Sequence, residues 1–456
     1  MLAAVAPAAV PVVSPLAAMS WIAVVFLAHL YFVDRQLPVF DLGAITLLAT
    51  AVYCTVPLLG FWFAGLRFTE FSYLPLYRYA PLPRDVGGFA WRHVLYLGCF
   101  ALAYAVTRGR ARVATGQIRA LRSSAIAALF VLAALLLAYF AVLQFWFGVS
   151  YDPSYSDLGT VVAPETVLPL ILRQLSQNMF AMIVLIKACL LMCLMRRWAD
   201  WRWRTTLLLW LLAEGVLTIT KMGGRTWYAM LLMAAVLLYH RLVKPLPVLR
   251  ATILALVVVG GMLVYGMARD LGGGIASVKS AEFSPWATMN EFQALYGIAY
   301  EVQVRKAAGL LGPVPWQIHF HDLILLVPSQ LLPFQKVDPC LGYPQTDGVG
   351  LGCVLGVVSV SLVGLDWLEL ACRGLLLGVL FAAIHRWYSA RQERFWPTAF
   401  YLCLCLWSYY TFRASTFYFL YFTIYRFVPM LVAVRLTQEV LRVANRLTIL
   451  EGRLQA

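Results

Sequence analysis

Arginines lie at the ends of several apolar segments, where their guanidinium groups could meet an anionic ligand. Arg225 falls in the short turn TKMGGRTWY, and Arg413 falls in a second short turn, YYTFRAST. Arg269 ends another apolar run, and Arg173 lies just inside a further one. A guanidinium donates two hydrogen bonds at once to a phosphate. We expect Arg225 and Arg413 to bind diphosphate, assisted by Arg269 and Arg305, with Arg173 as a further substrate contact; snorkelling to lipid headgroups is the alternative.

Two histidines and a carboxylate are the candidates for acid–base chemistry. In the segment HFHD, His319 and His321 alternate, so in an extended chain their side chains point the same way. A side chain that accepts a proton near neutral pH can serve as a general base. We predict that His321 or Glu291 does so and that His319 binds substrate. Ordinary surface histidines are the alternative, and no third ligand is spaced to complete a metal site.

The composition places these residues in a membrane protein. Hydrophobic residues make up 62% of the chain and charged residues only 12%, against about 25% in soluble domains. The net charge of +15 would suggest nucleic acid in a soluble protein. Here the basic residues cluster in short loops beside apolar runs, as they do in cytoplasmic loops, so nucleic-acid binding is disfavoured.

The apolar runs predict an all-α polytopic fold with about eleven transmembrane helices. These are expected at 16–34, 41–65, 88–106, 124–147, 168–195, 205–222, 226–242, 250–268, 366–387, 396–412 and 414–436. Basic loops mark the cytoplasmic side, and the base-free segment 148–167 is then external. The N-terminus lacks the basic start of a signal peptide, so we expect it to be retained, on the outer side.

The chain is predicted to divide into a bundle of about eight helices at 1–268, an external loop at 269–348, further membrane helices at 349–436 and a cytoplasmic tail at 437–456. Within the loop, residues 286–310 carry apolar groups at helical spacing, which predicts an amphipathic helix on the bilayer surface. The glycine-rich run that follows the loop either re-enters the membrane or crosses it. Charges inside the spans form ion pairs or line an outward cavity; they are Lys187, Glu214, Arg373 and Arg426.

Several classes of enzyme and pump are disfavoured because their motifs are missing. The sequence has no Walker, Rossmann or zincin motif, which nucleotide-driven pumps, dinucleotide enzymes and zinc peptidases use. Nothing resembles the DxD of metal-dependent sugar-nucleotide transferases. We therefore expect no cofactor and no bound metal.

Four stretches resemble the O-antigen polymerase (Wzy) family, also called oligosaccharide repeat-unit polymerases. TKMGGRTWYAMLLMAAVLLYHR resembles that family's Gly-x-Arg segment before an apolar helix, and VPSQLLPFQKVDP resembles its loop with paired prolines and a lysine. The glycine-rich run from Gly348 with the following helix, and FRASTFYFLYF, resemble its late blocks. The glycine-rich run lacks the acidic residue and the asparagine that are usual there.

The resemblance implies an enzyme of the bacterial inner membrane with a GT-C-type helical fold and a periplasmic active face. Such proteins join polyprenyl-diphosphate-linked oligosaccharides into a surface polysaccharide, using neither a metal nor a nucleotide sugar. The resemblance also leaves room for a partner that regulates chain length. The alternatives are an O-antigen ligase, a flippase or other lipid-linked oligosaccharide transporter, and a membrane acyltransferase. A transporter often shows inverted repeats, and no such repeat is evident in the sequence.

Overall fold

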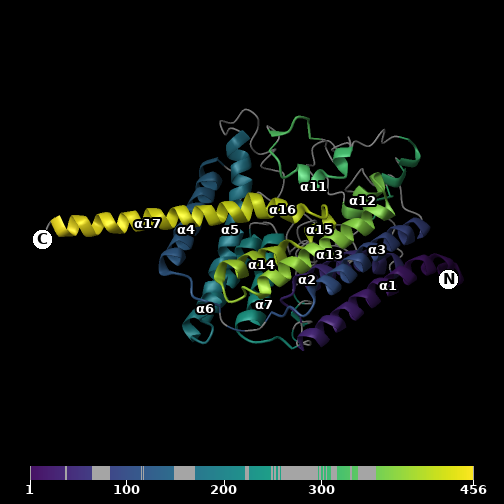
Figure 1. The fold of residues 1–456 in the computed structure, drawn as a ribbon, viewed down its shortest axis with the longest axis horizontal. Coiled ribbons are helices and arrows are strands. Elements are labelled where there is room, and N and C mark those ends of the chain that lie inside the picture. Colours follow the sequence, from purple (N-terminus) through teal and green to yellow (C-terminus); the bar gives the residue numbers. More distant parts are fainter. Residues whose placement is uncertain are drawn as a thin grey trace. The chain divides into compact units, whose positions relative to one another are not determined.

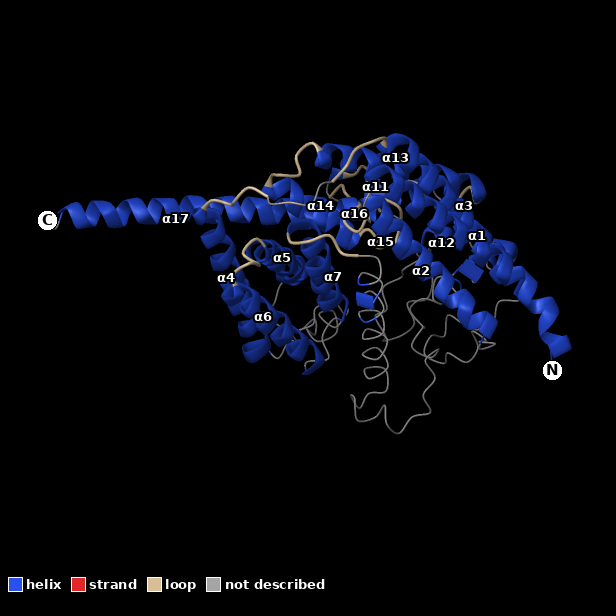
Figure 2. Cartoon of the chain, turned by 90° about the horizontal axis from the view of Figure 1, so that it is seen from below, coloured by secondary structure: helices blue, strands red, loops and turns tan. Residues whose placement is uncertain are grey.

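The structure, a computed structural model, consists of helices and loops in the part of the chain that it describes (Figures 1 and 2). The residues described are 2–35, 38–63, 83–113, 116, 118–147, 170–220, 225–247, 250, 253–254, 257, 296, 299–300, 302–304, 306–309, 316–328, 331–336 and 356–454. No strand occurs among these residues.

The helices follow the apolar runs of the sequence. They are α1 (Leu2–Asp34), α2 (Leu42–Phe63), α3 (Pro83–Arg108), α4 (Ser123–Phe147), α5 (Leu170–Met195), α6 (Trp201–Thr220), α7 (Arg225–Leu242), η5 (Trp316–Ile318), α11 (His321–Ile324), α12 (Gly356–Val363), α13 (Trp367–Ser389), α14 (Phe395–Trp407), α15 (Tyr410–Arg413), α16 (Tyr418–Phe422), η7 (Thr423–Phe427) and α17 (Val428–Leu454). By length and composition, five stretches among the described residues can cross a membrane: Val13–Asp34, Leu42–Leu59, Val86–Arg108, Trp367–Ser389 and Tyr418–Arg446. The chain is therefore a helical membrane protein, and these stretches account for part of the predicted set.

The chain forms two compact units, each assembled from segments that are distant in the sequence. The first unit comprises Met1–Val113, Leu246–Ala390 and Trp407–Tyr421, and the second comprises Ala114–Pro245, Arg391–Leu406 and Phe422–Ala456. The division into membrane helices, external loop and tail expected from the sequence stays a prediction.

In the first unit, α3 and α13 pack side by side along their length (Figure 1). A Cβ atom added to Gly374 would lie 2.7 Å from the carbonyl oxygen of Tyr96, and one added to Gly378 would lie 2.6 Å from that of Phe100. Small residues four apart are the usual device by which membrane helices approach closely. Both contacts advance along the two helices together, so α3 and α13 are parallel. Their basic C-terminal ends therefore share one side, as the positive-inside rule requires.

The C-terminal ends of α1, α3 and α13 meet in a buried ionic cluster. Arg108 donates hydrogen bonds to Asp34 at 2.5 Å and to Asp41 at 3.1 Å. The Nδ1 atom of His385 lies 3.5 Å from Asp41, and the Tyr104 hydroxyl donates to Asp41 at 2.9 Å. Burial alone would raise the pKa of Asp41, but His385 and Arg108 outweigh this and hold the pKa below its usual value. The cluster fastens three helices at the end where the sequence predicts the cytoplasm.

In the second unit, Arg241 joins segments of three loops that the sequence assigns to the cytoplasmic side. Its two terminal nitrogens donate to the carbonyl oxygens of Gly116 at 2.7 Å and Gln392 at 3.0 Å. The backbone N–H of Gly116 donates back to the Arg241 carbonyl at 3.0 Å, and the N–H of Arg119 donates to the Glu393 carbonyl at 2.7 Å. The three basic loops therefore meet within one unit. This agrees with the prediction that all three lie on the same side of the membrane.

Lys187 and Glu214 form an ion pair between α5 and α6 of the second unit. The Lys187 Nζ atom lies 2.6 Å from Glu214 Oε1, and the indole N–H of Trp210 donates to that oxygen at 3.1 Å. Both charged side chains are mostly buried. For these two charges the ion-pair interpretation holds.

The Lys187→Met variant should lose about 3–5 kcal/mol of stability, because it leaves the Glu214 carboxylate without its cation in an apolar setting. Thermal unfolding of the purified protein in detergent measures this loss. The double variant Lys187→Met with Glu214→Gln should recover most of it. Equal stability of Lys187→Met and the parent would show that the pair contributes nothing.

The segment predicted as an amphipathic helix is helical at each of its positions up to residue 307 that the structure describes, and one of its faces is buried. Tyr296, Ala299 and Val302 are fully enclosed. The Tyr296 hydroxyl donates to the carbonyl oxygen of Cys54 in α2 at 2.8 Å, and its ring centroid lies 5.2 Å from that of His93 in α3. This face packs on protein, and most of the remaining positions of the predicted segment lie outside the described residues, so its place on the bilayer surface stays a prediction.

The C-terminal helices differ from their predicted ranges. The run 396–412 is divided into α14 and α15, and the next run begins at Tyr418, passes through the π-helical segment η7 and continues as α17. The tail expected from residue 437 is thus an extension of the last helix to Leu454. Its residues are mainly good helix formers without proline, which explains the continuation.

Candidate functional site

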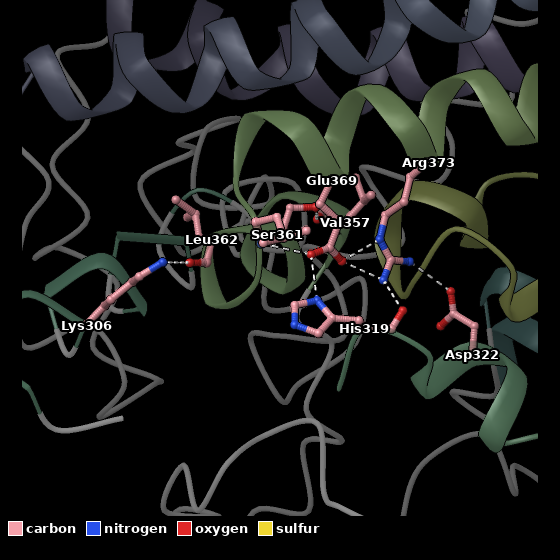
Figure 3. Close-up of polar contacts among 9 residues, drawn as sticks. Lys306, His319, Asp322, Val357, Ser361, Leu362, Glu369 and Arg373 are labelled. Carbon is pink, nitrogen blue, oxygen red and sulfur yellow. Dashed lines mark hydrogen bonds and ion pairs between the residues drawn. The ribbon is translucent and has the colours of Figure 1, made fainter. Parts of the chain in front are cut away.

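A buried group of charged side chains lies at the N-terminal end of α13 in the first unit (Figure 3). Arg373 donates from Nε to Glu369 Oε1 at 2.8 Å, one helical turn earlier. Its Nη1 donates to Asp322 Oδ2 at 3.2 Å, and its Nη2 donates to the carbonyl oxygen of His319 at 3.0 Å. All three charged side chains are buried. One guanidinium therefore links α13 to α11 and to the residue that follows η5, and its positive charge offsets the charge of the carboxylates.

Glu369 also orients the imidazole of His319. The Nδ1 atom of His319 lies 3.0 Å from Glu369 Oε2. Because an ionised carboxylate can only accept, we assign the ring proton to Nδ1, which leaves the lone pair on Nε2. The His319 side chain is 29% exposed, and in Figure 3 its second nitrogen is turned away from Glu369. A partly exposed imidazole held by a carboxylate is suited to act as a general base.

The backbone before α13 leaves room for no side chain at residue 364. The N–H of Leu365 donates to Glu369 Oε2 at 3.1 Å, which places the turn directly against the carboxylate. A Cβ atom on Gly364 would overlap this carboxylate and would lie 2.6 Å from His319 Cε1. A glycine here is therefore needed for the contact between Glu369 and His319.

A second ion pair fixes the turn between α12 and α13. Arg92 in α3 donates to both carboxylate oxygens of Asp366, each at 2.7 Å, and its guanidinium lies 4.6 Å from the centroid of the Trp367 ring. Asp366 has a φ of +53°, which is uncommon for a residue other than glycine. Its N–H donates to the Ser361 carbonyl at 2.7 Å. These bonds hold Asp366 in its strained conformation. They therefore fix the position of the first turn of α13, which carries Glu369.

The helix α12 comes just before α13 in the chain and packs against α13 and α15. It is buried throughout, and its eight residues are too few to cross a bilayer, which needs about twenty. At its C-terminal end the Lys306 ammonium donates to the Leu362 carbonyl at 2.6 Å (Figure 3). A cation is favourable there because the last carbonyls of a helix carry partial negative charge. The part of the glycine-rich run that the structure describes, which is α12, is therefore packed inside the protein.

Asp322 connects the site to the segment that carries Arg413. Its Oδ2 atom accepts the backbone N–H of Phe417 at 3.0 Å. Arg413 is the last residue of α15, only four positions before Phe417, and α15 packs on α12. The structure thus places the arginine predicted to bind diphosphate on a segment that contacts the His319 site, within the same unit.

The two predicted histidines differ in their surroundings. His319 follows the 3₁₀ turn η5, whereas His321 begins the short helix α11. The extended segment assumed for them is wrong, because helical turns replace the alternation that would align their side chains. The His319 ring is hydrogen-bonded to Glu369.

The other predicted site residues are spread more widely. Arg225 begins α7 and Arg173 lies in α5, both in the second unit. Glu291, Arg269 and Arg305 lie outside the residues that the structure describes.

The sequence analysis did not identify the residues that hold His319 in place. Glu369 was not singled out, and Arg373 stood only as a charge inside a span. Their spacing of four residues within one predicted helix is the signal that could have paired them. Nothing local pairs Arg92 with Asp366, which is 274 positions away.

The described residues contain no group of three or more His, Cys, Asp or Glu that could hold a metal ion. No known protein family matches the chain, and neither a curated protein nor a solved structure shows significant similarity to it. The chemistry of the site has to be argued from its own residues.

Proposed function

We propose that the protein is a glycosyltransferase that polymerises polyprenyl-diphosphate-linked oligosaccharide units on the periplasmic face of the inner membrane. The observation that carries the proposal is the His319 imidazole, held by Glu369 beside the buried Arg373. The positive-inside rule puts the basic C-terminal end of α13 in the cytoplasm, so its Glu369 end faces outward. The motif resemblance to repeat-unit polymerases supports the same assignment.

In the proposed reaction, His319 Nε2 accepts the proton of an acceptor sugar hydroxyl while the hydroxyl oxygen attacks the anomeric carbon of the donor. The new carbon–oxygen bond forms as the bond from that carbon to the lipid diphosphate breaks, and the diphosphate leaves with the electron pair. Glu369 stabilises the imidazolium, which later releases its proton to water. Arg413 stabilises the charge that develops on the diphosphate.

Reconstitution tests the proposal. The purified protein would be incubated with lipid-linked repeat units from its host, without metal or nucleotide, and the products separated on a gel. A ladder of chain lengths supports a polymerase. A single transfer to lipid A core would mean a ligase. Movement of intact lipid-linked sugar across liposome membranes without any ladder would mean a transporter and would remove every catalytic role proposed for His319.

We predict that Arg413→Ala lowers the rate of chain formation by about 10²–10³-fold, the usual effect of losing one group that stabilises charge in the transition state. Arg225→Ala should also weaken the ladder, since it is the other arginine predicted to bind diphosphate. Arg413→Lys should restore little activity, because an ammonium lacks the planar fork. Gel densitometry over time gives the rates. Full activity of Arg413→Ala would mean that Arg413 only meets lipid headgroups.

A further inference from the structure

The two short helical turns η5 and α11 bury their charged side chain and expose their large apolar ones. Asp322, the one acidic residue of these turns, is buried. Trp316, Phe320 and Leu323 are 56%, 53% and 48% exposed and form what we call the apolar face. The Trp316 ring centroid lies 6.2 Å from that of Phe320 and 5.5 Å from that of Phe334, so the exposed aromatic rings lie together. This arrangement is the reverse of a surface that meets water.

The sequence around the two turns is almost without charge. Between Lys306 and Lys336, Asp322 is the one aspartate, glutamate, lysine or arginine. In a soluble protein a stretch of this length would carry about seven such residues. An exposed apolar patch of this kind marks a surface that meets a membrane or another protein.

Hydrogen bonds fix the level of the apolar face relative to a membrane span. Arg373 donates to Asp322 at 3.2 Å and to the His319 carbonyl at 3.0 Å (Figure 3). Arg373 lies within the span Trp367–Ser389, about 9 Å along the helix from its start. The two turns are therefore held beside the first two turns of this span, where the hydrocarbon layer gives way to the lipid headgroups.

The neighbouring span gives the same level. Because Gly374 packs on Tyr96, the start of the α3 span at Val86 is level with residue 364, within one helical turn of Trp367. Trp367 is itself 41% exposed, and tryptophan is enriched where a helix enters the bilayer. Two parallel spans thus begin at one level, and the apolar face lies at that level.

We propose that the apolar face is inserted into the lipid bilayer, at the boundary between the headgroups and the acyl chains in the leaflet at the N-terminal end of α13. Tryptophan, phenylalanine and leucine are typical of segments that lie at this boundary. Both η5 and α11 are far too short to cross the membrane, so they enter one leaflet only. The contact holds His319, which precedes Phe320, at the headgroup level. Its use for a lipid-linked substrate rests on the proposed function, whereas the contact itself does not.

Photo-crosslinking identifies what covers the apolar face. The full chain would carry p-benzoylphenylalanine at position 320, in liposomes of phosphatidylethanolamine and phosphatidylglycerol. On irradiation this side chain bonds to a neighbouring C–H group. We expect the mass of the intact protein to rise by that of one phospholipid. The same group at Leu376, which is 58% exposed within the α13 span, should give this adduct too. At Glu393, an exposed residue in the loop after α13, it should give none.

The other occupants give different products. A product of twice the chain mass would mean that a second copy covers the face. An irradiated chain with no added mass would mean that another part of the same chain covers it. Either result would overturn the proposal. The label at Leu323 repeats the test at a second exposed position, and thermal unfolding in detergent shows which labelled chains are folded. A lipid adduct at Leu376 with none at positions 320 and 323 would also contradict the bilayer contact.

Discussion

Replacing His319 by alanine will lower the rate of chain formation by about 10²–10⁴-fold, the contribution typical of a general base. The fold should survive, because the His319 side chain is partly exposed and Arg373 bonds to the His319 backbone carbonyl rather than to its ring. The rate is measured with reconstituted protein and lipid-linked repeat units. Thermal unfolding of the same preparation shows that the loss is chemical.

His321 provides the matched control for this experiment. It is the same residue type two positions later, but it begins the helix α11, whereas the ring of His319 is held by Glu369. His321→Ala should therefore keep nearly full activity. The opposite pattern, with His321→Ala inactive and His319→Ala active, would return the base to the residue that the sequence first suggested.

The variant Glu369→Gln separates two effects of Glu369, the orientation of the His319 ring and the stabilisation of its positive charge. Glutamine can still accept the Nδ1 proton of His319, so the ring stays oriented, but the imidazolium loses its stabilising carboxylate. We expect activity between that of the parent and His319→Ala. Arg373 then keeps only one carboxylate, that of Asp322, and the loss of a buried partner costs about 3–5 kcal/mol. Activity is accordingly compared at a temperature where the variant is still folded.

The helices of this protein could be predicted from the sequence because each depends on its own residues. Lipid demands long apolar stretches with internal hydrogen bonds, and such stretches are visible one at a time. The ends of α3 and α13 agree with prediction to within a few residues. The last helix continues beyond the predicted span to Leu454, because charged residues such as arginine and glutamate are good helix formers and do not end a helix.

The candidate site could be predicted only in part, because its bonds join distant segments. The histidines and Arg413 stood out as polar residues in unusual places. Glu369 did not, since a carboxylate at the start of an apolar helix looks like an ordinary solvated end. Its partners come from residues 319 and 365, and their order in space depends on α12 and on the bond between Arg92 and Asp366. The pattern of residues within one segment carries no information about contacts between segments that are far apart in the sequence.

Replacing Gly378 by leucine will destabilise the first unit by about 1–3 kcal/mol or more, the cost of overpacking a tight interface. The added Cβ would lie 2.6 Å from the Phe100 carbonyl oxygen and 2.8 Å from the Ala103 Cβ atom. These are atoms of α3 close to its axis, so no flexible side chain can move aside. The two helices must separate, and the packing that small residues permit between them is lost. Unfolding in detergent, followed by tryptophan fluorescence, measures the change.

Ala383→Leu is the control, because it adds the same side chain to an exposed position of the same helix. It should leave stability unchanged. Since α13 also carries Glu369 and Arg373, separation from α3 should weaken the Arg92–Asp366 pair and lower activity even in the fraction that stays folded. Gly378→Ala should fall between the parent and Gly378→Leu in both properties. If Gly378→Leu is as stable as Ala383→Leu, the close approach of α3 and α13 does not exist in the protein, and the position of the site at their N-terminal ends would have to be abandoned with it.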